Sequence, residues 1–382
     1  MENDEQPEII VKFINETGGK KLSEKEKRLR YSVRVWKKRL KRRKVIERRK
    51  KHIRRLLQGK PLSLHNDIKT RVRYNDVRAP EDFSFLTNTE ETIDFLNRIE
   101  SYFNKRKQVF VVLKNVKNID HSAITVLLSL MYKFRVAKIK FNGDFPDDLK
   151  VKETIVDSQF FRKLLSPMSS DMGNDYTMTK NNQIFARANT IVVSEMGEKI
   201  MEESTKTIWG ERRICKGLQK TLIELMHNTN NHASRSEDNQ EHWWLSVNHD
   251  KENKKVDFYF VDYGQGILRS LERKSNPKIW NNFWDNFKKM IDLGSEQKVI
   301  ECLLNGEHWS PEQRIQPYYR GKGLPSIKDS LSRGQISDLQ IITNNTRSEV
   351  DSNNFIHLSK NFNGTFIHWK LEKNNENKIW NI

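Results

Sequence analysis

Cysteine is scarce in this sequence, which has only Cys215 and Cys302 among its 382 residues. Two cysteines cannot build a disulfide framework or a cysteine-rich zinc site, so the sequence excludes both of these classes. Because structural disulfides belong to oxidising compartments, the low count favours a reducing, intracellular setting, and we expect a cytoplasmic protein.

Long apolar runs are missing as well. Hydrophobic residues make up 36% of the chain, and no stretch approaches the roughly 18 consecutive apolar residues of a transmembrane helix. The first residues, MENDEQPEII, have neither the basic start nor the apolar run of a signal peptide. We therefore expect no membrane partner.

Acidic residues are few in one segment, which holds almost all of the net positive charge. Residues 20–60 contain 21 Lys and Arg but only three Asp and Glu, which leaves a net of +1 for the other residues of a chain whose total is +19. The excess is therefore a localised basic arm and not a property of the whole surface.

Proline and glycine are absent between residues 21 and 58 of this basic arm, and Gly59 and Pro61 come directly after that stretch. Apolar residues recur at the spacing of one helix face, at Leu29, Val33, Trp36 and Leu40. The pattern predicts one or two basic helices within residues 20–62. Their like charges repel one another unless a partner neutralises them.

The density of Lys and Arg in the arm is typical of segments that bind phosphate backbones by releasing counterions. Tyr31 and Trp36 would stack on bases, but no base-reading motif accompanies them, so we expect nucleic-acid binding without sequence preference. A protein partner with an acidic face and a charged coiled helix are the alternatives. The residues that we expect to contact nucleic acid are Lys37, Lys38, Arg39, Arg42, Arg43, Lys44, Arg48, Arg49 and Lys50.

The hydrophobic pattern divides the rest of the chain into two further domains, after a lead-in at residues 1–19. Residues 80–168 alternate helices with short valine-rich strands such as QVFVVLKNV, which predicts a small α/β domain. Residues 169–192 have little periodicity and are expected to form a linker. Residues 193–382 predict two helices, a hairpin of WWLSVNHD with KVDFYFVDYG, and the late strands DLQIIT, NFIHLS and GTFIHWKLE. The fold class that this order indicates is α+β.

One predicted helix in the last domain carries the segment ELMHNTNNHAS. Glu224, Asn228 and His232 are spaced four residues apart, so they share one face of that helix. A carboxylate and an amide on one face suit a base and a metal ligand that act on the same substrate. For His232, a polar helix end is an equally good explanation.

Three glycine-containing motifs follow that helix. VDYGQGI (261–267) ends a strand with a carboxylate and two glycines, which let the backbone approach a flat ligand. YYRGKGLPSI (318–327) has two glycines before a helix, whose first N–H groups would favour phosphate. GTF (364–366) opens a late strand with a hydroxyl. Each motif alone is weak, because a strand-end Asp usually forms a turn.

Taken in order, the four motifs resemble those of the GHKL superfamily of ATPases over about residues 195–372. That superfamily shares the Bergerat nucleotide-binding fold and includes gyrase-type topoisomerases, chaperone-like clamps, histidine kinases and anti-sigma-factor kinases. The resemblance implies that a C-terminal Bergerat-type α/β sandwich binds ATP and Mg²⁺.

The resemblance also implies a role for each motif. Asn228 would hold Mg²⁺ against the phosphates, and Glu224, the catalytic residue, would polarise the attacking water. Asp262 would bind the adenine amino group with support from Thr365. The other ATP-binding residues that the resemblance implies are His232, Gly264, Gly266, Ile267, Gly321, Lys322, Gly323 and Leu324.

Residues 275–320 would form a lid over ATP by the same resemblance. The segment is rich in aromatic side chains, for which plain helix packing and a lid-borne contact with a second copy of the chain are both explanations. A homodimer is therefore one expected arrangement. The aromatic residues are Trp280, Phe283, Trp284, Phe287, Trp309, Tyr318 and Tyr319.

The segment VFVVLKNVKNIDHSAITVLLSLM (109–131) is similar to the strand, loop and helix of a STAS domain, the anti-sigma-antagonist fold. In that fold a serine at the start of the helix is open to phosphorylation, and Ser122 aligns with it. Capping of the helix by Asp120 or Ser122 is the other explanation.

Three functions are compatible with these motifs. The Glu224 and Asn228 pair favours a Mg²⁺-dependent ATPase in which ATP acts as a switch for the basic arm. A serine protein kinase of the anti-sigma-factor type, acting on Ser122 or on a partner, is the first alternative. A nucleotide-binding scaffold without hydrolysis is the second.

Overall fold

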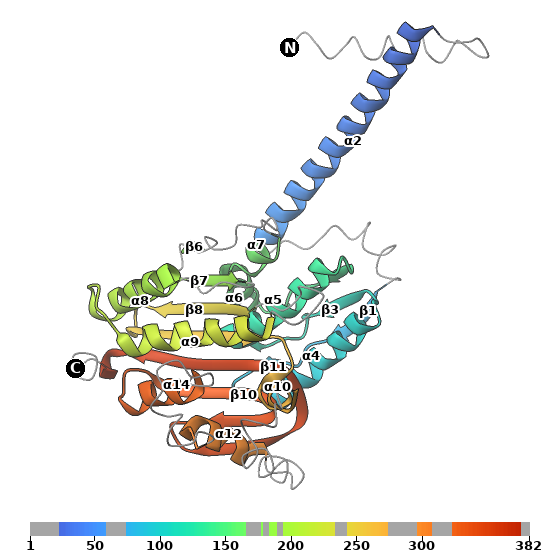
Figure 1. Cartoon of the computed structure of the whole chain (residues 1–382). Coiled ribbons are helices and arrows are strands. Elements are labelled where there is room, and N and C mark those ends of the chain that lie inside the picture. The colour runs from blue at the N-terminus through green and yellow to red at the C-terminus, as the bar shows by residue number, and fades with distance from the viewer. Residues whose placement is uncertain are drawn as a thin grey trace. The chain divides into compact units, whose positions relative to one another are not determined.

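The computed structural model divides the chain into two compact units, Met1–Leu62 and Ser63–Ile382 (Figure 1). It describes residues 23–58, 74–165, 177–178, 183–188, 194–233, 243–273, 296–307 and 323–375. Within these residues, no helix combines the length and the apolar character that crossing a membrane requires.

The described part of the first unit is a single helix, α2 (Glu24–Leu57), of 34 residues. The expected one or two basic helices are therefore one uninterrupted helix of about 50 Å at the usual rise per residue. Several of its apolar side chains are exposed, among them Tyr31 at 71% and Ile46 at 51%. The described part of this unit thus holds no apolar core.

A six-stranded sheet forms the centre of the second unit, and every neighbouring pair of its strands is antiparallel. The strand order is β10-β11-β9-β8-β7-β6. The bounds are β6 (Thr177–Met178), β7 (Gln183–Ala188), β8 (Trp243–Asp250), β9 (Lys255–Asp262), β10 (Ser337–Glu349) and β11 (Asn354–Glu372). A short 3-10 helix, η2 (Lys373–Asn375), follows the last strand.

Two features of this sheet differ from the pattern that the sequence predicts. β7 lies inside residues 169–192, the expected linker, and pairs along its length with β8. The segments NFIHLS and GTFIHWKLE form one continuous strand, β11. The polar residues between the two segments make the pairing of β11 with β10 irregular, but the strand continues through them.

Helices cover one face of the sheet. They are α8 (Ser194–Trp209), α9 (Lys216–Ala233), α10 (Gly266–Arg273), α12 (Glu296–Asn305) and α14 (Gly323–Ser332). Their apolar stripes bury alternate residues of the strands, among them Trp243, Leu245 and Trp369. The stacked rings of Phe258 and Trp369 lie 5.0 Å apart in this layer.

Residues 74–165 lie against the other face. They form the parallel sheet β1-β3-β5, a small β2-β4 pair and four helices. The strands are β1 (Asn75–Arg78), β2 (Asp82–Phe83), β3 (Val109–Val112), β4 (Asn118–Ile119) and β5 (Phe141–Gly143). The helices are α4 (Thr89–Asn104), α5 (His121–Val136), α6 (Leu149–Asp157) and α7 (Phe160–Leu165). α5 is buried on nearly every side, which explains its continuous apolar sequence.

The α/β layer and the large sheet share one hydrophobic core. Phe85 makes edge contacts with Phe362 and Phe366 at 4.9 Å, and Tyr132 contacts Trp244 at 5.4 Å. The segment that the sequence sets apart as residues 80–168 is therefore joined to the sheet by a continuous apolar contact.

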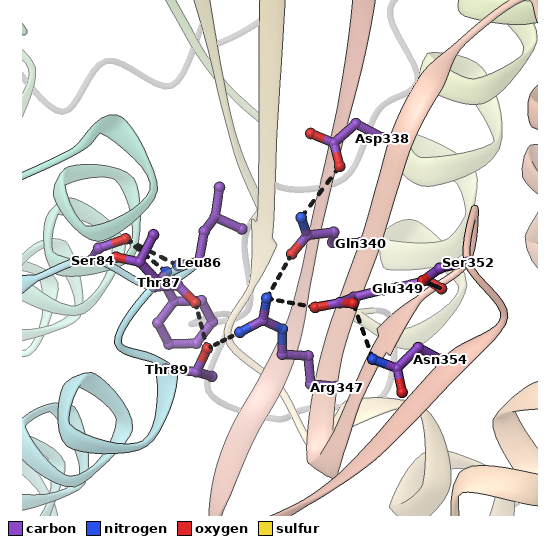
Figure 2. A network of polar contacts seen from close by, with 11 residues as sticks. Ser84, Leu86, Thr87, Thr89, Asp338, Gln340, Arg347, Glu349, Ser352 and Asn354 are labelled. Carbon is purple, nitrogen blue, oxygen red and sulfur yellow. Dashed lines mark hydrogen bonds and ion pairs between the residues drawn. The ribbon is translucent and has the colours of Figure 1, made fainter.

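A polar network also ties α4 to the large sheet (Figure 2). The guanidinium of Arg347, on β10, donates to Thr89 Oγ1 at 3.0 Å and to Glu349 Oε1 at 2.8 Å. Gln340 Oε1 accepts from the same guanidinium at 3.4 Å. The start of α4 is thus anchored to the far half of β10.

Candidate nucleotide-binding site

Helix α9 carries the first of the four motifs. Leu225 and Met226 are buried, at 2% and 1% exposure, and pack into the core between the helices and the sheet. Glu224 is half-buried on the flank of this apolar face. Asn228 and His232 belong to the helical backbone one and two turns further on, and their side chains lie outside the described residues. The backbone therefore puts the three positions on one face of α9.

Helix α14 packs along α9 and carries part of the third motif. Ser330 Oγ donates to the carbonyl of Gly217 at 3.4 Å, so the end of α14 meets the start of α9. A Cβ at Gly217 would lie 2.6 Å from Cβ of Gln335, so this close approach requires glycine. α14 consequently runs back along α9, and its first residue, Gly323, lies level with Glu224 at the usual rise per residue.

The start of α14 is only partly described. Gly323 is buried, and Leu324 is half-buried against the helix-side core. Gly321 and Lys322 lie outside the described residues. For a phosphate contact at this helix start, the position of Gly323 is therefore the evidence that the described residues supply.

The second and fourth motifs meet at one end of the sheet. Asp262 is the last residue of β9, and its register partners are Thr365 on β11 and Trp243 on β8. A Cβ at Gly364 would lie 2.5 Å from the carbonyl oxygen of Asp262, so β11 passes this residue as closely as glycine allows. Both Asp262 and Thr365 are half-buried. A carboxylate and a hydroxyl thus lie on adjacent strands at one sheet end, the pair that the resemblance implies for adenine.

The loop after Asp262 turns sharply into α10. The Gly264 amide donates to the carbonyl of Asp262 at 3.2 Å. Gly266 has φ of +77°, a conformation that favours glycine. A Cβ there would also lie 2.5 Å from Oδ1 of Asn344. The second glycine of the motif is therefore required by both backbone conformation and packing.

Two residues that the motifs do not contain hold this loop in place. Thr343 Oγ1 accepts from the Ile267 amide at 2.9 Å and donates to the Gly364 carbonyl at 2.9 Å. Asn344 Oδ1 accepts from the Leu268 amide at 3.1 Å. The first amides of α10 are thus satisfied by β10, and Ile267 offers a ligand its side chain and not its N–H. The sequence signal for this role is a polar pair that follows the apolar residues Ile341 and Ile342.

Figure 1 shows α9 running toward the sheet end at which β9 ends and α10 begins. The chain connects them closely, because β8 starts at Trp243, ten residues after the end of α9, and pairs there with Asp262. The described parts of all four motifs therefore lie where the helix layer meets one end of the large sheet.

The expected lid is described only over α12. Val299, Ile300, Leu303 and Leu304 of this helix are buried in the helix-side core. This part of residues 275–320 is therefore a packed helix. The aromatic residues named for the lid lie outside the described residues.

Ser122 is fully buried at the start of α5. Its hydroxyl accepts from the Phe85 amide at 2.9 Å and donates to the carboxylate of Asp120. Asp120 is the N-cap of α5 and accepts from the Ala123 amide at 3.0 Å. This geometry matches the capping explanation, because the Asp120 side chain accepts from the helix start. The Ser122 hydroxyl is buried and does not face solvent.

A magnesium ion at this site would depend on few protein ligands. Within the described residues, no cluster of three or more His, Cys, Asp or Glu side chains is arranged to bind a metal. Mg²⁺ usually keeps one or two protein oxygens together with phosphate oxygens and water. The single amide ligand that the resemblance implies, that of Asn228, is compatible with this ligand set.

Searches of protein-family models, of curated proteins and of solved structures each found no match to this chain.

Proposed function

We propose that this chain is a Mg²⁺-dependent ATP-binding protein of the GHKL type that hydrolyses ATP and uses nucleotide occupancy as a switch. The observation that carries the proposal is the direct pairing of Asp262 with Thr365 at the sheet end toward which α9 runs. Two motifs about 100 residues apart in the sequence meet there in the order and with the chemistry that an adenine site needs.

Each described side chain has a task in such a site. The carboxylate of Asp262 accepts from the exocyclic amine of adenine, while the Thr365 hydroxyl supports that carboxylate or a water beside it. Gly364 has no side chain, so the backbone of β11 passes close to the backbone of Asp262. These groups would bind the base, whereas the phosphates would be bound by the helices.

The phosphates would face α9 and the start of α14. Mg²⁺, held by the Asn228 amide oxygen, would neutralise phosphate charge. Glu224 lies one turn earlier on the same helix and would orient and deprotonate the attacking water. The first N–H groups of α14 would add hydrogen bonds to phosphate oxygens.

The test is to separate binding from hydrolysis with Glu224→Gln and Asp262→Asn. Glu224→Gln should lower ATP turnover by about 100-fold or more and leave the dissociation constant for ATP nearly unchanged. Asp262→Asn should weaken ATP and ADP binding together. Glu198→Gln, at an exposed position of α8, is the matched control and should change neither quantity.

Other outcomes would decide between the alternatives. Wild-type turnover in the Glu224 and Asp262 variants would overturn the proposal. Tight ATP binding without phosphate release would indicate a scaffold, whereas transfer of labelled γ-phosphate to protein would indicate a kinase.

A second function, nucleic-acid binding, is favoured by the distribution of charge on α2. The helix has 18 Lys and Arg against three Glu, and at about 100° per residue they lie on every side of its axis. Its apolar residues form no single stripe along its length, because Leu29, Val33, Trp36 and Leu40 share one face while Ile46, Ile53 and Leu57 fall on another. A helix that binds a membrane surface needs an apolar face along its length, whereas a helix in a groove meets phosphates on both sides.

A further inference from the structure

A buried ion pair lies between α4 and α5 on the side of the large sheet opposite α9. Lys133 Nζ is 3.2 Å from Glu100 Oε1, and the two side chains are only 15% and 11% exposed. Removing two charges from water is unfavourable unless further hydrogen bonds complete both groups. The partners that complete this pair therefore indicate what it does.

Those partners are the immediate neighbours of the proposed adenine site. Glu100 Oε2 accepts from Asn363 Nδ2 at 2.7 Å, and Asn363 precedes Gly364 and Thr365. Lys133 Nζ lies 5.0 Å from the ring centroid of Tyr263, which follows Asp262. One charge thus contacts the strand that carries the threonine, and the other contacts the residue after the aspartate.

The regular pairing of the strands ends at the same place. Thr365 and Asp262 form the last register pair between β11 and β9. On the other side of β11, Thr343 pairs with Thr365 but Asn344 pairs with Phe362, so two residues of β11 bulge between them. Beyond the Asp262–Thr365 pair, side-chain contacts and not backbone pairing join the described residues of β11 to the loop that follows β9.

The bulge residue Asn363 also reaches α10. Its Oδ1 accepts from Arg269 Nη1 at 3.3 Å and from Asn361 Nδ2 at 2.7 Å. Through this one amide, the Glu100 carboxylate is connected to α10, the helix that follows the loop after Asp262. Each oxygen of the Glu100 carboxylate has its own partner, Lys133 for Oε1 and Asn363 for Oε2, so the orientation of the carboxylate is fixed.

We infer that Glu100 and Lys133 are positioning residues for the adenine-binding carboxylate, an inference that rests on the proposed function. The pair fixes Tyr263 and Asn363 from the α4–α5 side of the sheet and thereby keeps Asp262 and Thr365 at the spacing that binds adenine. The α4–α5 layer is then part of the nucleotide site without touching the nucleotide, and its loosening weakens nucleotide binding.

The experiment compares this pair with a second polar link between the same layers. Lys133→Met and Glu100→Gln remove one charge each, and Glu100→Gln keeps an oxygen for Asn363. Arg347→Met is the matched control, because Arg347 also joins α4 to the sheet and is similarly shielded, at 18% exposure. Its partners on β10, Gln340 and Glu349, belong neither to the bulge nor to the loop after Asp262 (Figure 2). Affinity for a fluorescent ADP analogue and thermal stability are measured for the wild-type chain and the three variants.

We expect Lys133→Met and Glu100→Gln each to weaken ADP binding by about tenfold, and the double variant to add little to either. Arg347→Met should lower the melting temperature by a similar amount and change ADP affinity by less than about twofold. Equal weakening in the control, or wild-type affinity in both test variants, would overturn the inference.

Amide exchange in the nucleotide-free protein separates this inference from the proposed function. Lys133→Met should speed exchange at the Ile267 and Leu268 amides, while Arg347→Met should not. If the wild-type chain does not bind ADP, the proposed function fails. The exchange result then decides by itself whether the pair positions the loop, and unchanged exchange in Lys133→Met would reject that role.

Discussion

At the scale of single residues, Gly364 is a position of the candidate site at which an added methyl group would meet backbone. In Gly364→Ala the new methyl group would lie 2.5 Å from the carbonyl oxygen of Asp262, and rigid backbone cannot move aside cheaply. We expect unfolding in urea to show a loss of roughly 2–3 kcal/mol, together with weaker ADP binding.

Gly210→Ala is the control for that substitution. Gly210 has φ of +79° and no atom within 4 Å of an added Cβ. Its replacement therefore meets backbone strain alone, about 1 kcal/mol, and should leave ADP binding unchanged. Equal stability losses in the two variants would show that the contact with Asp262 is not what requires glycine at position 364.

The hydroxyl of Tyr263 gives a prediction of opposite sign. It is buried and has no hydrogen-bond partner among the described residues, and burial, with a further contribution from Glu100, raises its pKa well above the usual value. A buried hydroxyl without a partner is unfavourable. Tyr263→Phe should therefore keep or increase the free energy of unfolding, by up to about 1 kcal/mol. A clear loss in urea unfolding would mean that the hydroxyl has a stabilising partner.

His249 makes stability depend on pH on the acid side. Burial, with a smaller effect of Lys251, lowers its pKa from 6.5 to about 4, and Thr207 Oγ1 lies 2.8 Å from its Nδ1. The unfolded chain takes up a proton below about pH 6.5, whereas the folded chain does so only near pH 4. Stability should therefore be complete above about pH 6.5 and fall by roughly 3 kcal/mol toward about pH 4.

The check on His249 is urea unfolding between about pH 7 and about pH 4 with His249→Asn beside the wild-type chain. Asparagine keeps a polar group near Thr207 but does not titrate. The variant should lose less stability over this range than the wild-type chain does. Identical pH profiles would assign the acid-side loss to other groups, such as the buried His121, whose pKa burial also lowers.

The sequence could indicate only those residues of the candidate site that follow a motif. Asp262 and Thr365 stand in motifs, and the sheet pairs them. Thr343 and Asn344 have no spacing signal, because their role depends on a bulge in a different strand. Glu100 and Asn363 are 263 residues apart, and no local pattern connects positions at that distance.

At the scale of elements, α2 yields a prediction about salt. Each phosphate that the helix no longer neutralises should reduce the slope of log affinity against log salt by about 0.9. Changing Arg42, Arg43 and Lys44 to Gln should therefore reduce the slope for duplex DNA by up to about 3, measured by fluorescence anisotropy. Trp36→Ala is the control and should leave the slope unchanged. An unchanged slope in the triple variant, or tighter binding to anionic vesicles than to duplex, would contradict nucleic-acid binding by α2.

The same scale explains which elements the sequence pattern finds. β8 and β9 match the predicted hairpin, because alternating apolar residues and a short polar turn specify it locally. β7 has only six residues and depends on pairing with β8, which no local signal conveys. The pattern does not predict α6 either, although Asp148 caps this helix by accepting from the Val151 amide at 3.1 Å. Its two buried apolar positions, Val151 and Ile155, are too few to show a period.

At the scale of the whole second unit, the sheet has apolar residues on both faces. Trp243 and Trp369 face the helices α8 and α9, whereas Trp244, Tyr259 and Phe366 face α4 and α5. The sequence shows this as apolar runs without polar alternation, such as FYFV (258–261). Such a run is typical of a sheet covered on both sides, but it does not say which segment covers the second face.

That second face leads to a prediction about cooperativity. Trp244, Tyr259, Phe362 and Phe366 are buried by residues 74–165, and full burial of such side chains contributes about 1.5–3 kcal/mol each. For the four together this is about 6–12 kcal/mol, comparable with the whole stability of a typical domain. Residues 177–382 by themselves should therefore fail to reach the native packing and should bind a hydrophobic dye, whereas residues 63–382 should unfold in one calorimetric transition with equal van't Hoff and calorimetric enthalpies. Two separate transitions in residues 63–382, or a compact and dye-free 177–382 segment, would mean that the α/β layer and the large sheet fold independently despite their common core.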